Sequence, residues 1–342
     1  MGKRGFIAVL IVAILLSSIF AVSDYSELPD EKTVLFADSE PELLISAGSS
    51  SGHVNGSEIE WTPQGVVVAG DTRNNLNFDQ IQLQATSGYN QFVDADSYVA
   101  MIDEQGNWQW AVMPSASQGL TLINAMATDS AGDIYIGGTI FGQVVFGSTS
   151  NSPVIQSQNF DGFIAKIDST GQWMWATSFN TATNNDSNNS VVSGIVFDTS
   201  SGNLIVVGTH QGPTDFGGTT KTSSDNDMFM ASINTNTGSL NAVSTAGGIG
   251  DDRSAGVVVD SSGYIWQTGT TSGTFSGNGK THQALSQSDT VLVKWSQGGV
   301  VQSVKGFVSA AGEINLPEDI TINSNDDIII CLLYTSPSPR DS

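Results

Sequence analysis

Cysteine and basic residues are what this sequence most lacks. Among its 342 residues there is one Cys, and 11 Lys and Arg stand against 34 Asp and Glu. One Cys excludes an intramolecular disulfide and a Cys-based zinc site. The formal net charge of −23 argues against a nucleic-acid or anionic-membrane partner, because both require clustered Lys and Arg. Charged residues make up only 13% of the chain, about half the usual share in soluble domains.

Glycine and aromatic residues are plentiful. There are 37 Gly, fifteen Phe, seven Trp and six Tyr, and this many aromatic side chains can form a sizeable core, so disorder is not expected. No sustained helical period follows the first 23 residues, and we therefore expect almost no helix.

Residues 1–23 are typical of a secretory signal peptide. Lys3 and Arg4 precede an apolar run from Phe6 to Leu16, and small residues stand where a signal peptidase would cleave before Asp24. An uncleaved anchor helix is the alternative, because the 18-residue apolar segment is at the lower limit of a membrane-spanning length. Either way, the sequence predicts a secreted or cell-surface protein.

The last twelve residues, 331–342, differ abruptly from what precedes them. Cys331 to Asp341 resembles one translated reading frame of a common sequencing transposase adapter. We therefore expect 331–342 to be a non-native tail and the native chain to continue past Ile330. The Cys then belongs to the tail.

The middle of the chain repeats with a period of about 65 residues. One element begins with Asp, continues through an apolar strand, and runs through a turn into a second strand. In its first two copies the second strand contains a Trp-x-Trp sequence, ending at Trp110 and Trp175. The Asp recurs at spacings of 65, 66 and 62 residues, as Asp96, Asp161, Asp227 and Asp289.

A second element alternates with the first and places Asp and Gly around another turn. Asp suits the first position of a type I turn, where its carboxylate accepts a backbone N–H, and the Gly accepts the positive φ of a hairpin bulge. The turn pairs are Asp129 and Gly132, Asp198 and Gly202, and Asp260 and Gly263.

Each repeat therefore predicts two β-hairpins joined by a long middle connection. Four-stranded antiparallel units repeated at a fixed period predict an all-β fold, a β-propeller with about four complete units and partial ones. A β-solenoid is the alternative, but its repeats are shorter and lack paired hairpin turns. We expect an acidic linker at 24–42 and propeller repeats at 43–330.

One Phe recurs in each middle connection, and we interpret it as packing that connection onto its sheet. Blades usually span about 40–50 residues, so each unit carries roughly twenty more, mostly in this connection. The four residues are Phe78, Phe146, Phe216 and Phe275.

The repeat resembles a known family. The pattern Asp-x-Phe-Ile-Ala-Lys-Ile-Asp-x-x-Gly-x-x-x-Trp-Ala from Asp161, followed by apolar-Asp-Ser-x-Gly-x-Ile-Tyr-x-x-Gly-Thr, resembles the SBBP-type β-propeller repeats of secreted bacterial and archaeal proteins. The resemblance covers roughly residues 56–330. It implies an exported propeller, often part of a large surface protein, and it carries over no catalytic residue.

No catalytic set stands out. His53, His210 and His282 fall in different segments, and no Gly-x-Ser-x-Gly elbow is present. Gly277–Thr281 has the ending of a phosphate-binding loop without the required earlier Gly. Asp168–Trp175 approaches the docking pattern of quinone-cofactor propeller dehydrogenases but is one residue short.

Calcium remains an open alternative to a cofactor-free protein. Acidic clusters occur at 224–227, 250–252 and 325–327. None fits the twelve-residue EF-hand loop, but carboxylate and carbonyl oxygens on rigid turns can hold Ca²⁺.

The fold-bearing residues repeat while no reactive set repeats with them. We therefore expect a non-enzymatic binding or structural module, with a surface glycan or a protein as its partner. A secreted propeller enzyme, either a carbohydrate hydrolase or lyase or a quinone-type dehydrogenase, is the alternative.

Overall fold

The protein is all-β in the part that its computed structural model describes. That part comprises residues 54–86, 95–116, 119–182, 188–308 and 315–334. These ranges contain twenty-three strands, β1 to β23, and no helix, so the predicted all-β class is confirmed. No helix in these ranges could cross a membrane. The expected signal peptide, linker and residues 335–342 lie outside them.

The strands form four antiparallel four-stranded units, numbered here in chain order, and a final hairpin. The first is β1 (Val54–Thr62), β2 (Gly65–Thr72), β5 (Asp96–Ile102) and β6 (Trp108–Val112). The second is β8 (Leu120–Thr128), β9 (Ile134–Val145), β10 (Val154–Ile167) and β11 (Trp173–Thr181). The third is β12 (Asn189–Asp198), β13 (Asn203–Asp215), β14 (Thr220–Asn234) and β15 (Leu240–Ile249). The fourth is β16 (Asp252–Val259), β17 (Ile265–Thr271), β20 (Asp289–Trp295) and β21 (Val301–Phe307), and the hairpin is β22 (Asn315–Ile322) with β23 (Ile328–Tyr334).

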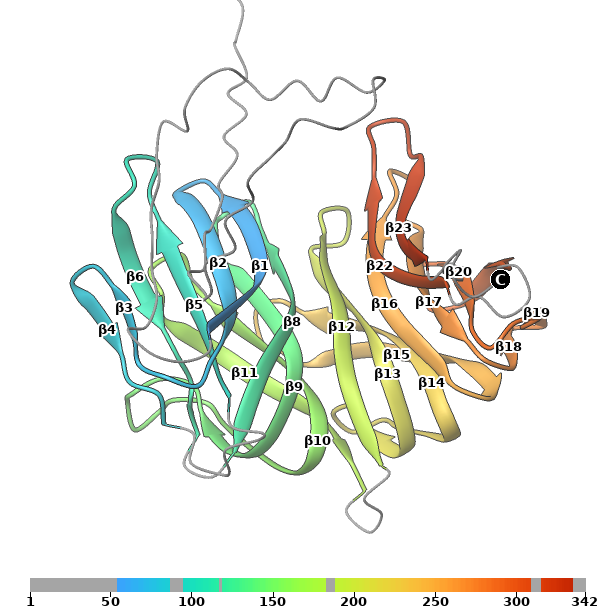
Figure 1. Ribbon diagram of the computed structural model, residues 1–342, viewed down its shortest axis with the longest axis horizontal. Helices are drawn as coiled ribbons and strands as arrows, with labels where there is room; N and C mark the ends of the chain where they lie inside the picture. The colour runs from blue at the N-terminus through green and yellow to red at the C-terminus, as the bar shows by residue number, and fades with distance from the viewer. Residues whose placement is uncertain (1–53, 87–94, 117–118, 183–187, 309–314, 335–342) are drawn as a thin grey trace, which may run out of the picture.

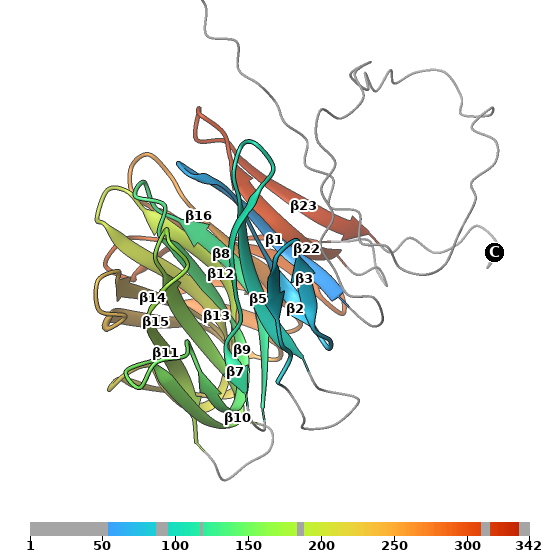
Figure 2. The same ribbon diagram turned by 90° about the vertical axis from the view of Figure 1, so that its left-hand side faces the viewer.

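The units stand side by side along an arc (Figure 1). The first strand of each unit lies on the inner side, and these inner strands touch in the order β1, β8, β12, β16 and β22. The first unit and the β22–β23 hairpin lie at similar heights near the two ends of the arc (Figures 1 and 2). The sheets of the described residues do not close into a barrel or a propeller.

The hydrophobic core lies between the units. Successive side chains of a strand point to opposite faces of its sheet. In β9, Ile134 and Ile136 pack against the first unit, whereas Tyr135 packs against the third. A third cluster fills the space between the third and fourth units. Both faces of a sheet are therefore buried, which explains why these strands read as continuous apolar runs.

The middle connections are hairpins, where the sequence suggested mostly loop. In the second and third units, β9–β10 and β13–β14 simply run on beyond the four-stranded sheet. The first and fourth units use separate short strands instead. These are β3 (Leu76–Phe78) with β4 (Ile81–Leu83), and β18 (Thr274–Gly277) with β19 (Lys280–Gln283).

Each of the last three middle hairpins pairs with the outer edge of the preceding unit. The short strand β7 (Ser115–Ala116) pairs with the far end of β9, β11 pairs with the far end of β13, and β15 pairs with β18. The roughly twenty additional residues of a unit thus join it to its neighbour. Local spacing could not reveal this, because the partner strand is in the previous repeat.

The turns follow the geometry that Asp and Gly favour. Asp129 Oδ1 accepts the N–H groups of Ala131 and Asp133 at 2.9 and 3.0 Å, and Gly132 has a φ of 85°. Gly263 and Gly202 adopt φ values of 79° and 70° at the corresponding turns. Positive φ carries no steric cost for glycine, so these turns need it.

The end of β23 includes residues from the expected non-native tail. Cys331 faces Asp319 across the β22–β23 pair, and Leu333 faces Leu316. These residues continue the apolar strand that begins at Ile328. The non-native origin of residues 331–342 stays a prediction.

Candidate functional site

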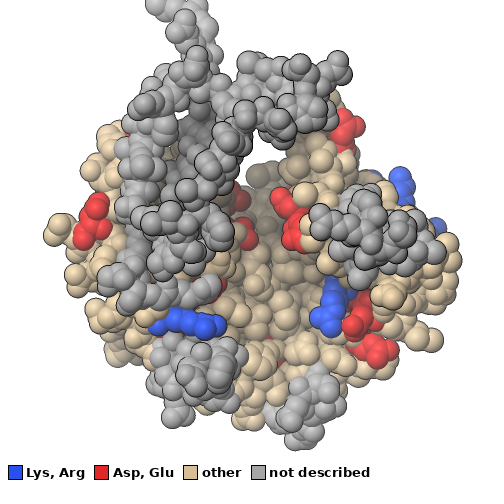
Figure 3. Space-filling view, viewed as in Figure 1, with Lys and Arg blue, Asp and Glu red and all other residues tan. Residues whose placement is uncertain are grey.

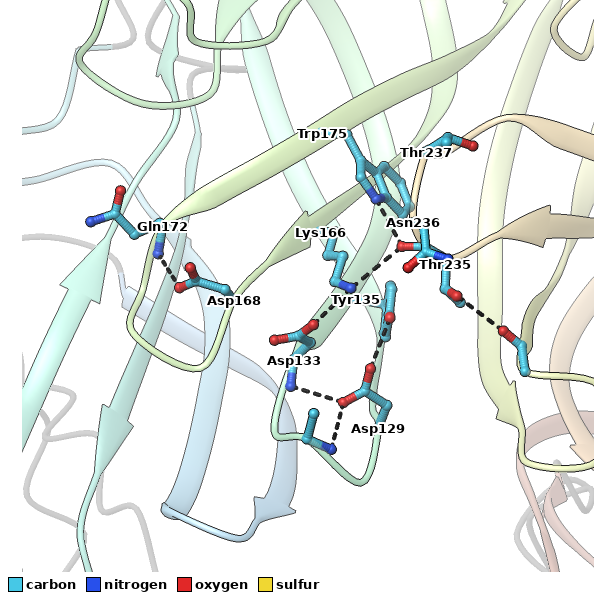
Figure 4. Close-up of polar contacts among 12 residues, drawn as sticks. Asp129, Asp133, Tyr135, Lys166, Asp168, Gln172, Trp175, Thr235, Asn236 and Thr237 are labelled. Atoms are coloured by element: carbon cyan, nitrogen blue, oxygen red, sulfur yellow. Dashed lines mark hydrogen bonds and ion pairs between the residues drawn. The ribbon is translucent and has the colours of Figure 1, made fainter.

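Two tryptophans on outer strands hold neighbouring units together. Trp110 Nε1 donates a hydrogen bond to the carbonyl oxygen of Ser169 in the next unit at 3.2 Å. Trp175 Nε1 donates in the same way to Thr235 at 3.0 Å, as Figure 4 shows. A Cβ on Gly238 would lie 2.6 Å from Trp175 Cε3. The indole therefore covers the turn glycine, and both Trp residues serve packing between units.

The polar residues around Asp129 and Lys166 form a closed network (Figure 4). Lys166 Nζ lies 2.7 Å from Asp133 Oδ2 and donates to the Thr235 carbonyl oxygen at 3.4 Å. Tyr135 donates to Asp129 Oδ2 at 3.0 Å. Burial works to lower the pKa of Lys166, but hydrogen bonds with Asp133 and Tyr135 raise it above its usual value. Lys166 therefore stays charged and engaged in bonding between units.

The fourth unit repeats this network with different residues. Lys294 Nζ lies 3.6 Å from Asp260 Oδ2 and 3.8 Å from the centre of the Tyr264 ring. Trp266 Nε1 donates to Asp260 Oδ2 at 2.8 Å. In the third unit, Asp198 accepts hydrogen bonds from two serine hydroxyls at 2.7 and 2.6 Å. Since the arrangement recurs, it indicates a structural role and not a unique reactive site.

Three of the four repeated third-strand aspartates are buried and hydrogen-bonded. Asp96, Asp161 and Asp289 are 0%, 2% and 0% exposed. Each accepts a backbone N–H from a neighbouring segment, at 2.6, 2.9 and 3.0 Å respectively. They thus anchor the chain around the third strand. Asp227 is only partly buried, and its Oδ1 has no hydrogen-bond partner among the described residues.

The four repeated phenylalanines lie in four different parts of the core. Phe78, Phe146, Phe216 and Phe275 are each at most 2% exposed. Phe146 packs edge-on to Trp173 with ring centroids 5.1 Å apart. Their position on or beside the middle hairpins explains why each unit needs one.

The remaining candidates do not form a site. Burial lowers the pKa of His210 to about 4, and its ring packs against Phe216. His282 contacts Asp289 at 3.0 Å, while His53 lies outside the described residues. Gly277–Thr281 forms the β18–β19 hairpin turn. In the described part of the chain, no three His, Cys, Asp or Glu side chains are grouped so that they could hold a metal ion.

A bulge interrupts each of the five inner strands at the same place. At the bulge, one residue of the first strand has no paired residue on the second strand. The skipped residues are Ser57, Asn124, Ser193, Ala255 and Glu318. The residues that follow them are Glu58, Ala125, Gly194, Gly256 and Asp319.

Small residues follow the bulge where inner strands pack closely. A Cβ on Gly194 would lie 3.2 Å from Gly256 Cα, and one on Gly256 would lie 2.9 Å from Ile320 Cγ2. At the two ends of the arc this position holds a carboxylate instead, from Glu58 and Asp319.

These two carboxylates and Glu60 form what we call the acidic opening. Burial raises the pKa of Glu58 to about 7, and repulsion from Glu60 and Asp319 adds to this. Burial also raises the pKa of Glu60. Acidic side chains flank the hollow at the centre of the arc in Figure 3. The opening can therefore attract a positively charged group.

Sequence reasoning missed the acidic opening. Glu58 lies in the first copy of the repeat, whose sequence has diverged from the others, and Asp319 lies in an incomplete last copy. The available signal was a carboxylate at a position where the three middle units carry Ala125, Gly194 and Gly256. The bulge that aligns these positions is visible only in the strand pairing.

Comparisons with known proteins do not assign a family. No family model matches the sequence, and no curated protein matches it. Among solved structures it is similar to the extracellular domain of BT4673 from B. thetaiotaomicron, described as a hybrid two component system, with 9% identity and a TM-score of 0.30. The match covers 82% of this chain and 37% of that chain.

Proposed function

We propose that this chain is an exported β-propeller module of the SBBP repeat type that binds a positively charged partner at the acidic opening. The proposal of export rests on the signal-like first 23 residues. The proposal of a propeller rests on four-stranded units that pack face to face with their inner strands in contact.

The gathering of the Glu58, Glu60 and Asp319 carboxylates between the two ends of the arc is the observation that carries the binding role. Carboxylates that repel one another gain stability when a cation comes between them. The repeated residues of the units are occupied in packing, whereas Glu58, Glu60 and Asp319 form no repeated network. A lysine- or arginine-rich peptide segment is the ligand class that this charge favours.

Titration of the full chain with a lysine-rich peptide tests the proposal. We expect Glu58→Gln combined with Asp319→Asn to weaken binding roughly tenfold, and added salt to weaken binding to the wild type. Glu104→Gln, which removes an exposed carboxylate from a turn of the first unit, should bind as the wild type does. Equal affinity of all three proteins would rule out the acidic opening as the binding site.

A carbohydrate hydrolase is the second candidate, because a carboxyl with a pKa near 7 suits a general acid. A screen of oligosaccharides for turnover distinguishes the two functions. Turnover that Glu58→Gln abolishes would establish the enzyme and overturn the binding-only role. Binding without turnover supports the module.

A further inference from the structure

The junction between the third and fourth units brings together two acidic clusters that are 25 residues apart in the sequence. Asn226 Nδ2 donates to Asp251 Oδ1 at 2.7 Å, and the Gly250 N–H donates to Asp225 Oδ2 at 3.4 Å. These contacts place the irregular part of β14 against the start of β16. Asp252, the first residue of β16, is 0% exposed.

The two preceding junctions have a hydroxyl where this one has Asp252. Thr121, Ser190 and Asp252 lie at equivalent positions on the first strands of the second, third and fourth units. Each pairs with the same position of the second strand, two residues after the Gly of a Gly-Thr sequence that recurs in that strand. Thr121 Oγ1 accepts the Ser97 N–H at 2.9 Å. Ser190 Oγ accepts the Gly162 N–H at 2.8 Å and donates to the Phe179 carbonyl oxygen at 2.6 Å. A carboxylate cannot donate in this way.

Asp227 has also lost the hydroxyl donors that serve its counterpart. Asp161 Oδ1 accepts the Thr181 hydroxyl at 2.7 Å, and its Oδ2 accepts the Ser157 hydroxyl at 2.5 Å. By strand register, Gly248 stands in place of Thr181. Ser223 stands in place of Ser157, but its hydroxyl donates to the His210 carbonyl oxygen instead.

Two of the oxygen atoms left at this junction, Asp227 Oδ1 and Asp252 Oδ2, lie close together. Among the described residues, Asp227 Oδ1, both oxygens of Asp252 and Asn226 Oδ1 are buried without a hydrogen-bond partner. A Cβ on Gly247 would lie 2.2 Å from Asp227 Oδ1 and 2.9 Å from Asp252 Oδ2. The glycine leaves the space in which the two carboxylates meet. The junction therefore has an excess of acceptors and a deficit of donors.

The electrostatics point the same way. Burial, then repulsion from Asp227 and Asp251, raises the pKa of Asp252 to about 7, although the Thr271 hydroxyl and the Gly248 N–H act to lower it. Burial also raises the pKa of Asp227 to about 6. The nearby cation, Arg253, pairs with Asp251 Oδ2 at 3.3 Å. Buried carboxylates without a donor are costly unless a cation or a proton joins them.

We propose that the junction of the third and fourth units is a Ca²⁺ site, formed by the carboxylates of Asp227 and Asp252 and by Asn226 Oδ1. Carboxylate and amide oxygens are hard ligands, the type that Ca²⁺ prefers, and backbone carbonyls or water complete its coordination. This site has only two ionisable ligands, because its third side-chain ligand is an amide. It therefore differs from the groups of three His, Cys, Asp or Glu side chains that are absent from the described residues. By bridging β14 and β16, the ion would hold the third and fourth units together.

Thermal unfolding of the full chain, in chelator-treated buffer and with added CaCl₂, tests the proposal. We expect millimolar Ca²⁺ to raise the Tm of the wild type by roughly 5 °C. Asp252→Ser restores the residue that Ser190 provides in the preceding junction, so it should fold and lose the shift. Asp161→Asn changes the counterpart of Asp227 in the second unit, so it should lower the Tm but keep the shift.

Several outcomes overturn the site. One is the absence of a shift in the wild type, and another is a shift that Asp252→Ser or Asp227→Asn retains. An equal rise in Tm with NaCl of the same ionic strength also contradicts the site, because it would reflect general screening of the negative charges and not Ca²⁺ binding. If a proton occupies the junction instead, the Tm rises between pH 8 and pH 6 in Asp252-containing chains and Ca²⁺ has no effect.

Discussion

Identical residue types at repeated positions have different properties in this protein because their neighbours differ. Asp161 receives hydrogen bonds from Ser157 and Thr181. Asp252 is equally buried, but neither of its oxygens has a hydrogen-bond partner of good geometry among the described residues, and the Thr271 hydroxyl and the Gly248 N–H only partly offset the cost of its burial. The number of nearby donors thus decides whether a buried carboxylate stabilises the fold or strains it.

Glu58 leads to a prediction about pH. Its pKa in the folded protein is raised from 4.5 to about 7, so protonation of Glu58 favours the folded state. This contribution to the free energy of unfolding is fully present below pH 4.5 and is lost as the pH rises through 7. Glu58→Gln should therefore unfold at the same urea concentration as the wild type near pH 4, below the unfolded-state pKa. At pH 8.5 we expect the variant to be more stable, by about 1 kcal/mol after allowance for solvent screening.

The comparison is made between variant and wild type at each pH. His210, whose pKa burial lowers to about 4, favours folding at higher pH and is present in both proteins. Equal urea midpoints for the two proteins at pH 8.5 would show that burial and the neighbouring carboxylates do not raise the pKa of Glu58.

Among the structural elements, the turns were the most predictable from sequence. Asp129 and Gly132 are three residues apart, and the carboxylate and the positive φ act within that span. The strands flanking each turn follow from apolar runs of the appropriate length. Such features depend on local chemistry alone.

Two glycines in the third unit separate backbone strain from packing. Gly202 and Gly238 have nearly equal φ values of 70° and 72°. A Cβ on Gly202 meets nothing within 4 Å, whereas one on Gly238 meets the Trp175 ring at 2.6 Å. Gly202→Ala should cost about 1 kcal/mol of unfolding free energy. Gly238→Ala should cost at least about 1 kcal/mol more, because the indole must move.

Chemical denaturation of both variants measures this difference. Trp175→Ala provides a further check, because in its background the two alanine substitutions should become similar in cost. Equal costs in the wild-type background would mean that Trp175 does not pack on the Gly238 turn.

The non-local elements were beyond sequence reasoning. The middle hairpins pair with the previous repeat, and the clusters around Asp227 and Asp252 meet across a junction. The acidic clusters themselves were visible in the sequence, but one chain without its fold does not show which clusters converge. The Phe residues were interpretable because burial requires only an apolar partner, whereas a binding site requires specific neighbours.

For the molecule as a whole, the cores between units make stability depend on neighbours. The second and third units each contribute to two clusters that they share with an adjacent unit. Among the described elements, the β22–β23 hairpin packs mainly on the fourth unit. In a stack of this kind, stability is approximately a sum of unit and interface contributions.

Hydrogen exchange monitored by mass spectrometry tests this expectation. Peptides from β10 and β13 should exchange most slowly, and those from β22 and β23 should exchange fastest, because opening the hairpin breaks one interface only. Uniform protection across all units would instead indicate a single cooperative structure.

The pairing of each middle hairpin with the unit before it gives the stack a direction. Translation releases the chain from its N-terminus, so each of the last three middle hairpins reaches a partner strand that has already emerged. The outer edge strand of a folded unit pairs with the middle hairpin of the next unit and so provides a template for its folding. Folding can therefore keep pace with synthesis, and a newly made unit leaves its exposed edge uncapped only until its successor arrives.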